Sequence, residues 1–215
     1  MHPETKRPNS NGPSDRRDSS RNPASSSSSL NTRKLWLAAG LLLLLGVTAW
    51  QLHYQGRLWW CSCRGFLWTS DGWGSLTSQT FLDPYSFTHL LHGVMFCGLL
   101  ALLIRRMPVR WQLFMAIAME SAWELIENTN TVIDRYRQAT AALGYNGDTV
   151  VNSLGDIMCC ALGFMIARKL GWWRSIAIYA ATEVVLLIWI RDTLLLEVIM
   201  LIRPINAIKV WQLGH

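Results

Sequence analysis

Three glutamates share one stripe of an otherwise hydrophobic segment. The stretch AMESAWELIEN, residues 118–128, holds Glu120, Glu124 and Glu127, and side chains three or four positions apart lie on the same face of a helix. Carboxyl groups held close together split their pKa values, so that one can donate a proton while its neighbour accepts one. A charged group in hydrocarbon is costly unless it is paired or hydrated. The stripe therefore predicts a polar cavity between helices.

Two more segments carry polar pairs with helical spacing. His89 and His92 are three positions apart, Asn152 and Asp156 are four apart, and Asp148 comes shortly before the second pair. Imidazole and carboxylate groups together are a ligand set for zinc, manganese or iron. The spacing matches no established metal-binding motif. A divalent metal is one interpretation of the set, and hydrogen bonding between helices is another.

The elements that must position these side chains are hydrophobic helices. Hydrophobic residues make up 51% of the 215 residues, and charged residues make up only 16%. The apolar residues form blocks, and residues 35–52 (LWLAAGLLLLLGVTAWQL) contain no formal charge. About 17–25 apolar residues are needed to cross the ~30 Å hydrocarbon core of a bilayer. The predicted fold class is therefore all-α, an integral membrane helical bundle.

The bundle is predicted to have about five transmembrane helices plus a short C-terminal helix. The candidate spans are residues 35–52, 86–104, 111–126, 150–167 and 172–190. The segment 193–205 has a short apolar run that Pro204 stops, so we expect an interfacial helix there, with a sixth span as the alternative. We interpret residues 35–52 as an uncleaved signal anchor, with a cleaved signal peptide as the alternative. Residues 33–213 together form the predicted polytopic membrane domain.

The N-terminal tail carries most of the net charge of +6. Residues 1–34 contain seven basic and three acidic residues. Residues 1–32 are rich in Ser and Arg and cannot bury enough apolar surface to fold, so we predict a disordered cytoplasmic tail. Its partner would be the anionic surface of the lipid bilayer. The chain has neither a recognisable motif nor a basic folded face of the kind that binds nucleic acid.

Short basic loops set the predicted orientation. Residues 105–110 (RRMPVR) and 168–174 (RKLGWWR) are compact and basic, as are residues 33–34, and such segments stay on the cytoplasmic side. The N-terminus would then be cytoplasmic, and the loops 53–85 and 127–149 would face outward. Three consecutive helices would carry their polar residues near their outer ends, around one cavity that opens outward.

Several of the polar residues receive a candidate role at this cavity. The catalytic candidates are Glu124, Glu127 and Asp148. The candidate metal ligands are His89, His92 and Glu124. The candidate substrate-binding residues are Arg135, Arg137, Arg191 and Asn152, because a guanidinium group suits an anionic head group.

Simpler interpretations compete with several of these roles. Asp148 could cap the helix that follows it, where a carboxylate is favoured. Arg135 and Arg137 could lie in a solvated loop, and Arg191 could pair with Asp192. Glu183, in the middle of the last span, could pair two helices.

The five cysteines predict no disulfide framework. Cys97, Cys159 and Cys160 fall in apolar runs, where cysteine behaves as a small hydrophobic residue. Cys61 and Cys63 are separated by one residue, a spacing that rarely suits disulfide geometry.

The residues above also carry a family resemblance. The run SFTHLLHG … ESAWELIENTNTVIDRYRQATAALGYNGDTVVNSLGDIMCCALGF … IRDTLLLEVIMLIRPINAIKVWQ closely resembles an uncharacterised family of bacterial multi-pass membrane proteins, defined as a domain of unknown function. The resemblance covers roughly residues 70–213 and implies a bacterial cell-membrane protein without an assigned activity.

A fainter resemblance is to the VanZ-like membrane proteins, some of which are linked to glycopeptide resistance. The residues that would occupy the polar positions of that family are His89, Glu124, Asp148 and Asn152, with Gly155 and Gly163 in the helix that follows. We carry no activity over from it.

Two hypotheses on function follow. In the first, the chain is an envelope enzyme that acts on a lipid-linked or head-group substrate at the outer leaflet, with a divalent metal as its cofactor. In the second, it is a non-catalytic membrane protein whose polar cluster is structural, or binds or transports a small ligand.

Overall fold

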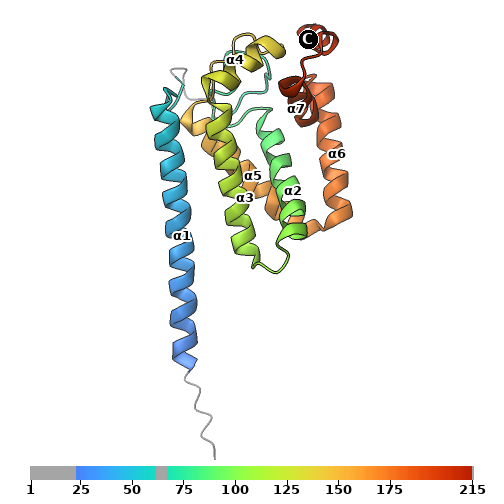
Figure 1. The fold of residues 1–215 in the computed structure, drawn as a ribbon. Helices are drawn as coiled ribbons and strands as arrows, with labels where there is room; N and C mark the ends of the chain where they lie inside the picture. The colour runs from blue at the N-terminus through green and yellow to red at the C-terminus, as the bar shows by residue number, and fades with distance from the viewer. Residues whose placement is uncertain (1–22, 62–66, 215) are drawn as a thin grey trace, which may run out of the picture. The chain divides into compact units, whose positions relative to one another are not determined.

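The computed structural model describes residues 23–61 and 67–214, with side chains from residue 35 onward. Its helices are α1 (Pro23–Tyr54), α2 (Ser86–Leu103), α3 (Val109–Glu127), α4 (Asn130–Ala139), α5 (Val150–Leu170), α6 (Trp172–Trp189), α7 (Leu194–Ile202) and α8 (Asn206–Leu213) (Figure 1). An isolated bridge between Trp68 and Leu82 is the one β-element in the described residues. The all-α class is confirmed.

The chain divides into two units, residues 1–39 and 40–215, and the site described below lies within the second. Of the predicted disordered tail, residues 1–22 lie outside the described residues and stay a prediction, whereas residues 23–32 form the start of α1. Within the second unit, α2, α3 and α5 pack together, and α6 contacts α2 and α5.

The predicted segments are helical, and two further helices appear. Residues 134–137, interpreted as loop, lie in α4, which begins after Thr129 because the Thr129 side chain accepts a hydrogen bond from the backbone N–H of Val132. The C-terminal segment forms two helices, α7 and α8, because Pro204 interrupts it.

Among the described residues, three helices are long and apolar enough to cross a membrane: Leu35–Tyr54, Ser86–Leu103 and Val150–Leu170. The expected bundle of five spans is not confirmed. The other two candidates, α3 and α6, have 19 and 18 residues, a spanning length, but neither is one of these three. α3 holds the three glutamates of the stripe, and α6 holds Arg174 and Glu183.

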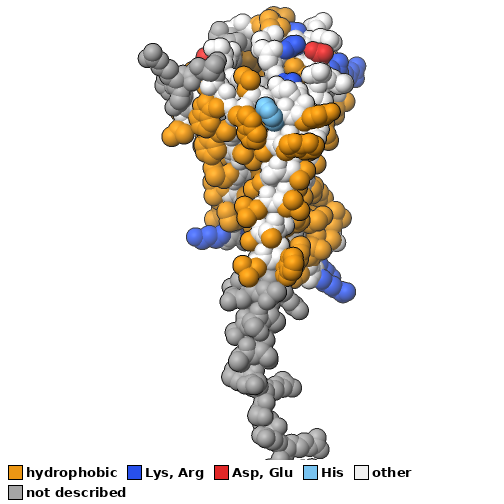
Figure 2. Space-filling model, turned by 90° about the vertical axis from the view of Figure 1, so that its left-hand side faces the viewer, with side chains coloured by type: hydrophobic (Ala, Val, Ile, Leu, Met, Phe, Trp, Pro, Cys, Tyr) orange, Lys and Arg blue, Asp and Glu red, His pale blue; other side chains and the backbone are white. Residues whose placement is uncertain are grey.

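The outward faces of the helices are apolar. Large hydrophobic side chains are exposed on α1, α2, α5 and α6, among them Leu42, Leu43, Val47, Leu99, Leu102, Leu103, Leu162, Met165, Val185 and Ile188. Figure 2 shows hydrophobic side chains along one such face, with Lys and Arg towards its two ends. Water-exposed surfaces rarely carry so much contiguous apolar area, so this is the surface of a membrane protein.

Helices α2 and α5 approach each other closely through glycine. A Cβ atom on Gly93 of α2 would collide with the backbone carbonyl of Cys160, and one on Gly163 of α5 would collide with the carbonyl of Leu90. Beside this contact lies a hydrophobic cluster that includes Phe164. The close packing fixes the depth of α2 against α5, and with it the relative depth of their polar residues.

One end of the bundle gathers the polar residues. The first turns of α2 and α5 and the last turns of α3 lie at this end, where α4 and the loop before α2 also sit (Figure 1). Thr149 caps α5 by accepting a hydrogen bond from the N–H of Asn152. The carboxylate of Glu183 accepts from the backbone N–H groups of Leu194 and Leu195, so it joins α6 to the start of α7.

Cys61 is in a disulfide bond, so the expectation of no disulfide is wrong for this residue. Cys63 lies outside the described residues. Cys97, Cys159 and Cys160 are free thiols, as expected for cysteines in apolar helices.

Candidate functional site

A buried carboxylate joins two histidines between α2 and α3. Glu120 Oε1 lies 2.6 Å from His89 Nδ1 and 3.0 Å from His92 Nδ1, and Glu120 is fully buried. The two imidazole rings are 5.2 Å apart between centroids and nearly perpendicular. The predicted polar cluster between helices is therefore confirmed, with Glu120 at its centre.

A second glutamate on the same stripe reaches the same histidine. Glu124 Oε1 lies 3.2 Å from His89 Nδ1, and Glu124 is also fully buried. Neither of its carboxylate oxygens accepts a hydrogen bond from the described residues. A buried polar atom without a partner is unusual in a folded protein and marks a site that a ligand or a proton could complete.

Helix α5 closes the cluster from the third side. Asp156 Oδ2 lies 3.9 Å from the other ring nitrogen of His89, and Asp156 is 3% exposed. Its second oxygen, Oδ1, has no hydrogen-bond partner among the described residues.

Two sets of three side chains could each offer a metal one ligand atom per residue. The sets are His89, His92 and Glu120, and His89, Glu124 and Glu127, with the ligand atoms of each set within 4.8 Å of one another. The sequence assignment of metal ligands named both histidines and Glu124 but left out Glu120, which is the closest carboxylate to both rings.

Asp148 is held by a network and does not act as a helix cap. Its Oδ2 accepts a hydrogen bond of 2.7 Å from the Asn128 amide, and its Oδ1 accepts one of 3.1 Å from the Tyr145 hydroxyl. The cap of α5 is the neighbouring Thr149. These hydrogen bonds fix the position of Asp148, which lines the cavity described below.

A cavity of about 600 Å³ opens beside the histidines. Its lining includes five carboxyl side chains, from Glu127, Asp148, Asp156, Asp192 and Glu197, and five large aromatic side chains, from Trp73, Tyr85, Trp123, Tyr136 and Tyr145. None of the described residues that line it is Arg or Lys. The cavity is therefore acidic and aromatic.

The three candidate anion-binding arginines lie elsewhere. Arg135 donates to the carbonyls of Leu201 and Ile202 at the end of α7. The other two are also engaged: Arg137 donates to the carbonyl of Tyr145 and pairs with Asp134, and Arg191 donates to the carbonyl of Trp211 and lies over its ring. None of the three lines the cavity.

Asn152 faces the loop that precedes α2. Its side-chain amide donates a 2.8 Å hydrogen bond to the carbonyl of Thr80, and its backbone N–H donates to Thr149. Asn152 is buried but does not line the cavity. The structure thus gives it the role of fastening the loop to α5.

Burial shifts the acidic groups at the mouth of the cavity toward their neutral forms. Loss of solvent raises the pKa of Asp192 to about 7, although the N–H of Thr193 and the Tyr85 hydroxyl favour its charged form. Burial likewise raises the pKa of Asp148, against the hydrogen bond from Asn128. Burial also raises the pKa of Glu197 well above its ordinary value, and the nearby charge of Asp192 adds to that effect.

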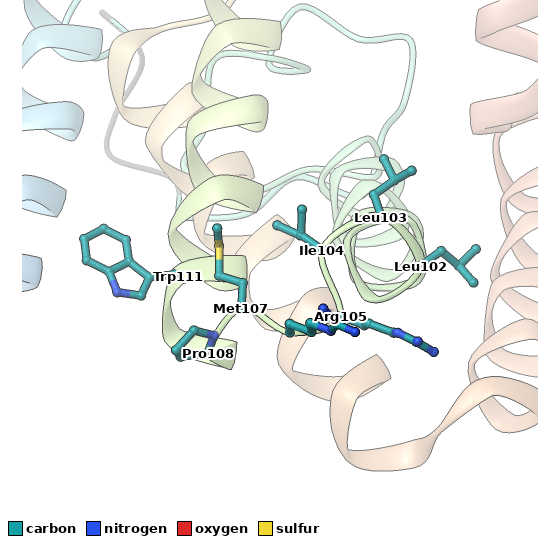
Figure 3. Close-up of a pocket in the computed structure, with 8 residues that line it drawn as sticks. Leu102, Leu103, Ile104, Arg105, Met107, Pro108 and Trp111 are labelled. Carbon is teal, nitrogen blue, oxygen red and sulfur yellow. The ribbon is translucent and has the colours of Figure 1, made fainter.

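A second hollow, of about 700 Å³, lies at the turn between α2 and α3 (Figure 3). Leu102, Leu103 and Trp111 line it together with Arg105 and Arg106. Such a mixture of apolar, aromatic and basic side chains is typical of a membrane interface. This hollow contains none of the residues of the His–Glu cluster (His89, His92, Glu120 and Glu124), which lies at the opposite ends of α2 and α3.

Several residues of the site were absent from the sequence assignments: Glu120, Asn128, Asp156, Asp192 and Glu197. Two signals pointed to some of them. Glu120 and Asp156 share helical faces with assigned residues, and Glu197 is the one acid in the apolar run of residues 193–202. An ionisable residue in such a run is by default a functional candidate. No local pattern marks Asn128, because its partner Asp148 lies 20 residues away.

Similar proteins are known from several bacteria. A family profile described as "Protein of unknown function (DUF2585)" matches residues 52–214. A UPF0314 protein of Rhizobium meliloti (strain 1021) is 43% identical over 181 residues, covering 82% of this chain and 92% of the relative. One of Sphingopyxis alaskensis is 40% identical over 184 residues, covering 85% and 97%.

A third relative, a UPF0314 protein of Paracoccus denitrificans (strain Pd 1222), is 39% identical over 171 residues, covering 79% of this chain and 89% of the relative. No solved structure matches the chain. The resemblance to an uncharacterised bacterial family is confirmed, while the fainter one to VanZ-like proteins stays a prediction.

Proposed function

The chain belongs to the DUF2585 family of bacterial proteins, and we propose that it is a multi-pass inner-membrane protein that binds a divalent metal ion between its helices. The observation that carries the proposal is the convergence of His89, His92 and Glu120. Two imidazole nitrogens and a carboxylate, buried together, are a donor set suited to zinc, manganese or iron.

The residues around this set suit hydrolytic chemistry. A bound divalent metal would supply an activated water and would polarise the group under attack. Glu124 lies beside His89, and neither of its carboxylate oxygens has a hydrogen-bond partner among the described residues, so its role would be that of a general base. Glu127 and Asp148 line the adjoining cavity and would contact the substrate. The proposed activity is hydrolysis of a lipid-linked or head-group substrate.

The cavity is proposed to open on the outer side of the membrane, with the N-terminus and the α2–α3 turn in the cytoplasm. Arg105 and Arg106 on that turn favour a cytoplasmic position. The disulfide at Cys61, in the loop before α2, favours an oxidising compartment such as the periplasm. In this topology α3 and α6 also cross the membrane, which makes five spans.

A structural role for the cluster is the second candidate. The distances of 2.6 and 3.0 Å from Glu120 to the two imidazoles are hydrogen-bond distances, so the three side chains could serve to hold α2 against α3. The two candidates differ in one measurable property, the metal content of the folded protein.

The test is elemental analysis of protein purified in detergent, with its melting temperature recorded. The wild type is compared with His92→Ala and Glu120→Gln, and Asp134→Asn serves as the control because Asp134 is an exposed acid outside the cavity. We expect close to one zinc, manganese or iron per wild-type and control chain, and at least a tenfold lower content in both site variants. A chain without metal in all four samples, with both site variants melting lower, would establish the structural role instead.

The general base is tested separately. Glu124→Gln should keep its metal, because Glu120 and both histidines remain, but should no longer release head groups from a bacterial polar lipid extract. Release by Glu124→Gln at the wild-type rate would remove Glu124 from the proposed chemistry.

A further inference from the structure

We propose that the cavity beside the His–Glu cluster binds its ligand through a positively charged organic ammonium group. This inference rests on the proposed function, because it names the chemical class of the molecule that the same cavity takes. It reverses the expectation from sequence that arginines would hold an anionic head group.

The charge of the lining is the first observation. Five carboxyl side chains line the cavity, while none of its described lining residues is Arg or Lys. The nearby arginines Arg135, Arg137 and Arg191 donate to backbone carbonyls, and none of the three lines the cavity. An anion would meet these five carboxyl groups with no Arg or Lys to pair with, whereas an organic cation can pair with a carboxylate and donate hydrogen bonds to a carboxyl oxygen.

Unpartnered oxygens are the second observation. Asp156 is 3% exposed and lines the cavity, and its Oδ1 has no hydrogen-bond partner among the described residues. Glu127 also lines the cavity, and its Oε2 is likewise buried without a hydrogen-bond partner among the described residues. Buried hydrogen-bond acceptors of this kind are satisfied by a donor, and an ammonium group donates hydrogen bonds and also carries a positive charge.

Aromatic rings on different walls are the third observation. Tyr85 and Trp73 contact each other edge to face at 6.4 Å, and on another wall Tyr136 and Tyr145 do so at 5.6 Å. Trp123 stands against His92 at 6.0 Å. Ring faces attract organic cations, and aromatic rings around a pocket are how proteins recognise quaternary ammonium groups.

The proposed metal does not account for the outer part of the lining. Its three ligands come from α2 and α3, whereas Asp192 and Glu197 come from the turn after α6 and from α7. Tyr85 links the two regions, because it precedes α2 directly and its hydroxyl donates to Asp192 at 3.4 Å. A volume of about 600 Å³ has room for a small molecule as well as an ion.

The test is titration calorimetry on the full chain in an uncharged detergent, with choline and ethanolamine as cationic probes and glycerol phosphate as the anionic probe. We expect both cations to bind and the anion not to bind. Glu197→Gln and Asp192→Asn should each weaken the binding of the cations at least tenfold, while Asp134→Asn leaves it unchanged. Metal content, measured on the same samples, should not change in any of these variants.

The aromatic wall has its own matched pair of variants. Tyr136→Phe keeps the ring and should bind choline within about threefold of the wild type, whereas Tyr136→Leu should lose at least tenfold. Comparable melting temperatures of the two variants exclude unfolding as the cause, and equal binding by them would overturn the role of the ring.

A third set of titrations identifies the source of the ammonium group. Nanodiscs that contain phosphatidylethanolamine should compete with choline if the natural ligand is a lipid head group. Nanodiscs of phosphatidylglycerol alone are the control. If choline binds equally strongly in the presence of either kind of nanodisc, phosphatidylethanolamine does not compete and the ligand is a free amine.

The proposal is overturned if neither cation binds to wild-type protein, or if glycerol phosphate binds more tightly than both. These outcomes are separate from the metal result. A chain that binds choline but contains no metal supports the cation site and rejects the proposed metal. A chain that contains metal but binds neither cation supports the metal site and rejects the cation site.

Discussion

The side chain of Asn128 and residue Asp148 are joined by two reciprocal hydrogen bonds. The Asn128 amide donates to Asp148 Oδ2 at 2.7 Å, and its carbonyl oxygen accepts from the Asp148 backbone N–H at 2.8 Å. Asn128 is fully buried. The pair fastens the end of α3 to the residue that precedes the cap of α5, so it sets the distance between the glutamate stripe and the start of α5.

Asn128→Ala should therefore destabilise the protein. The substitution leaves a buried carboxylate and a buried N–H with fewer partners, which costs about 1–3 kcal/mol for each unsatisfied group. Thermal unfolding in detergent would measure the loss as a lower melting temperature. Asn130→Ala is the control, because Asn130 is exposed at the start of α4 and should change stability by less than about 0.5 kcal/mol. Equal melting of the two variants would contradict the proposed role of the pair.

The close approach of α2 and α5 predicts a strong effect of one added methyl group. In Gly93→Ala the new Cβ meets the backbone carbonyl of Cys160, so the two helices must separate. We expect a loss of at least about 2 kcal/mol, because overpacking against rigid backbone is costly. The reference is Gly46→Ala in α1, where nothing lies within 4 Å of the new Cβ. Similar yields and melting temperatures for both variants would show that the α2–α5 contact is looser than described.

Asp192 should make stability depend on pH. Its pKa is about 7 in the folded protein, against an ordinary value of 3.8. Below pH 4 the carboxyl is neutral in both folded and unfolded chains. Between about pH 4 and 7 it ionises in the unfolded chain first, so stability falls as pH rises, by at most about 4 kcal/mol from this group.

The check is the melting temperature from pH 4 to pH 8. Asp192→Asn should show a smaller decrease over this range than the wild type, and Asp134→Asn should follow the wild type because Asp134 is exposed. Asp148 and Glu197 also have raised pKa values, so part of the decrease should remain in Asp192→Asn. Identical curves for Asp192→Asn and the wild type would rule out Asp192 as a titrating group.

The proposed topology predicts which loops a reagent outside the cell can reach. Cysteines introduced at the exposed positions Arg106 and Asp134 would be treated with a membrane-impermeant maleimide. In intact spheroplasts, Asp134→Cys should be labelled and Arg106→Cys should not, because these residues belong to opposite ends of the bundle. Arg106→Cys should be labelled after lysis. The reverse pattern would place the cavity on the cytoplasmic side.

By itself, the sequence determined the class of the protein and the residues that gather at one end of it. Long apolar runs require helices in a bilayer, where all backbone hydrogen bonds must be made within the segment. Helical spacing placed Glu120, Glu124 and Glu127 on one stripe. Since polar stripes in hydrocarbon must face one another, helical spacing was also enough to predict that this stripe meets His89.

Tertiary structure alone decided which partner each of these residues has. Glu120, and not Glu124, lies closest to both histidines, and this depends on how α2 packs against α3. Arg135 is turned onto the end of α7, so it does not line the acidic cavity. These outcomes depend on contacts between segments far apart in the chain, where the direction of a side chain follows from packing, and no local spacing records it.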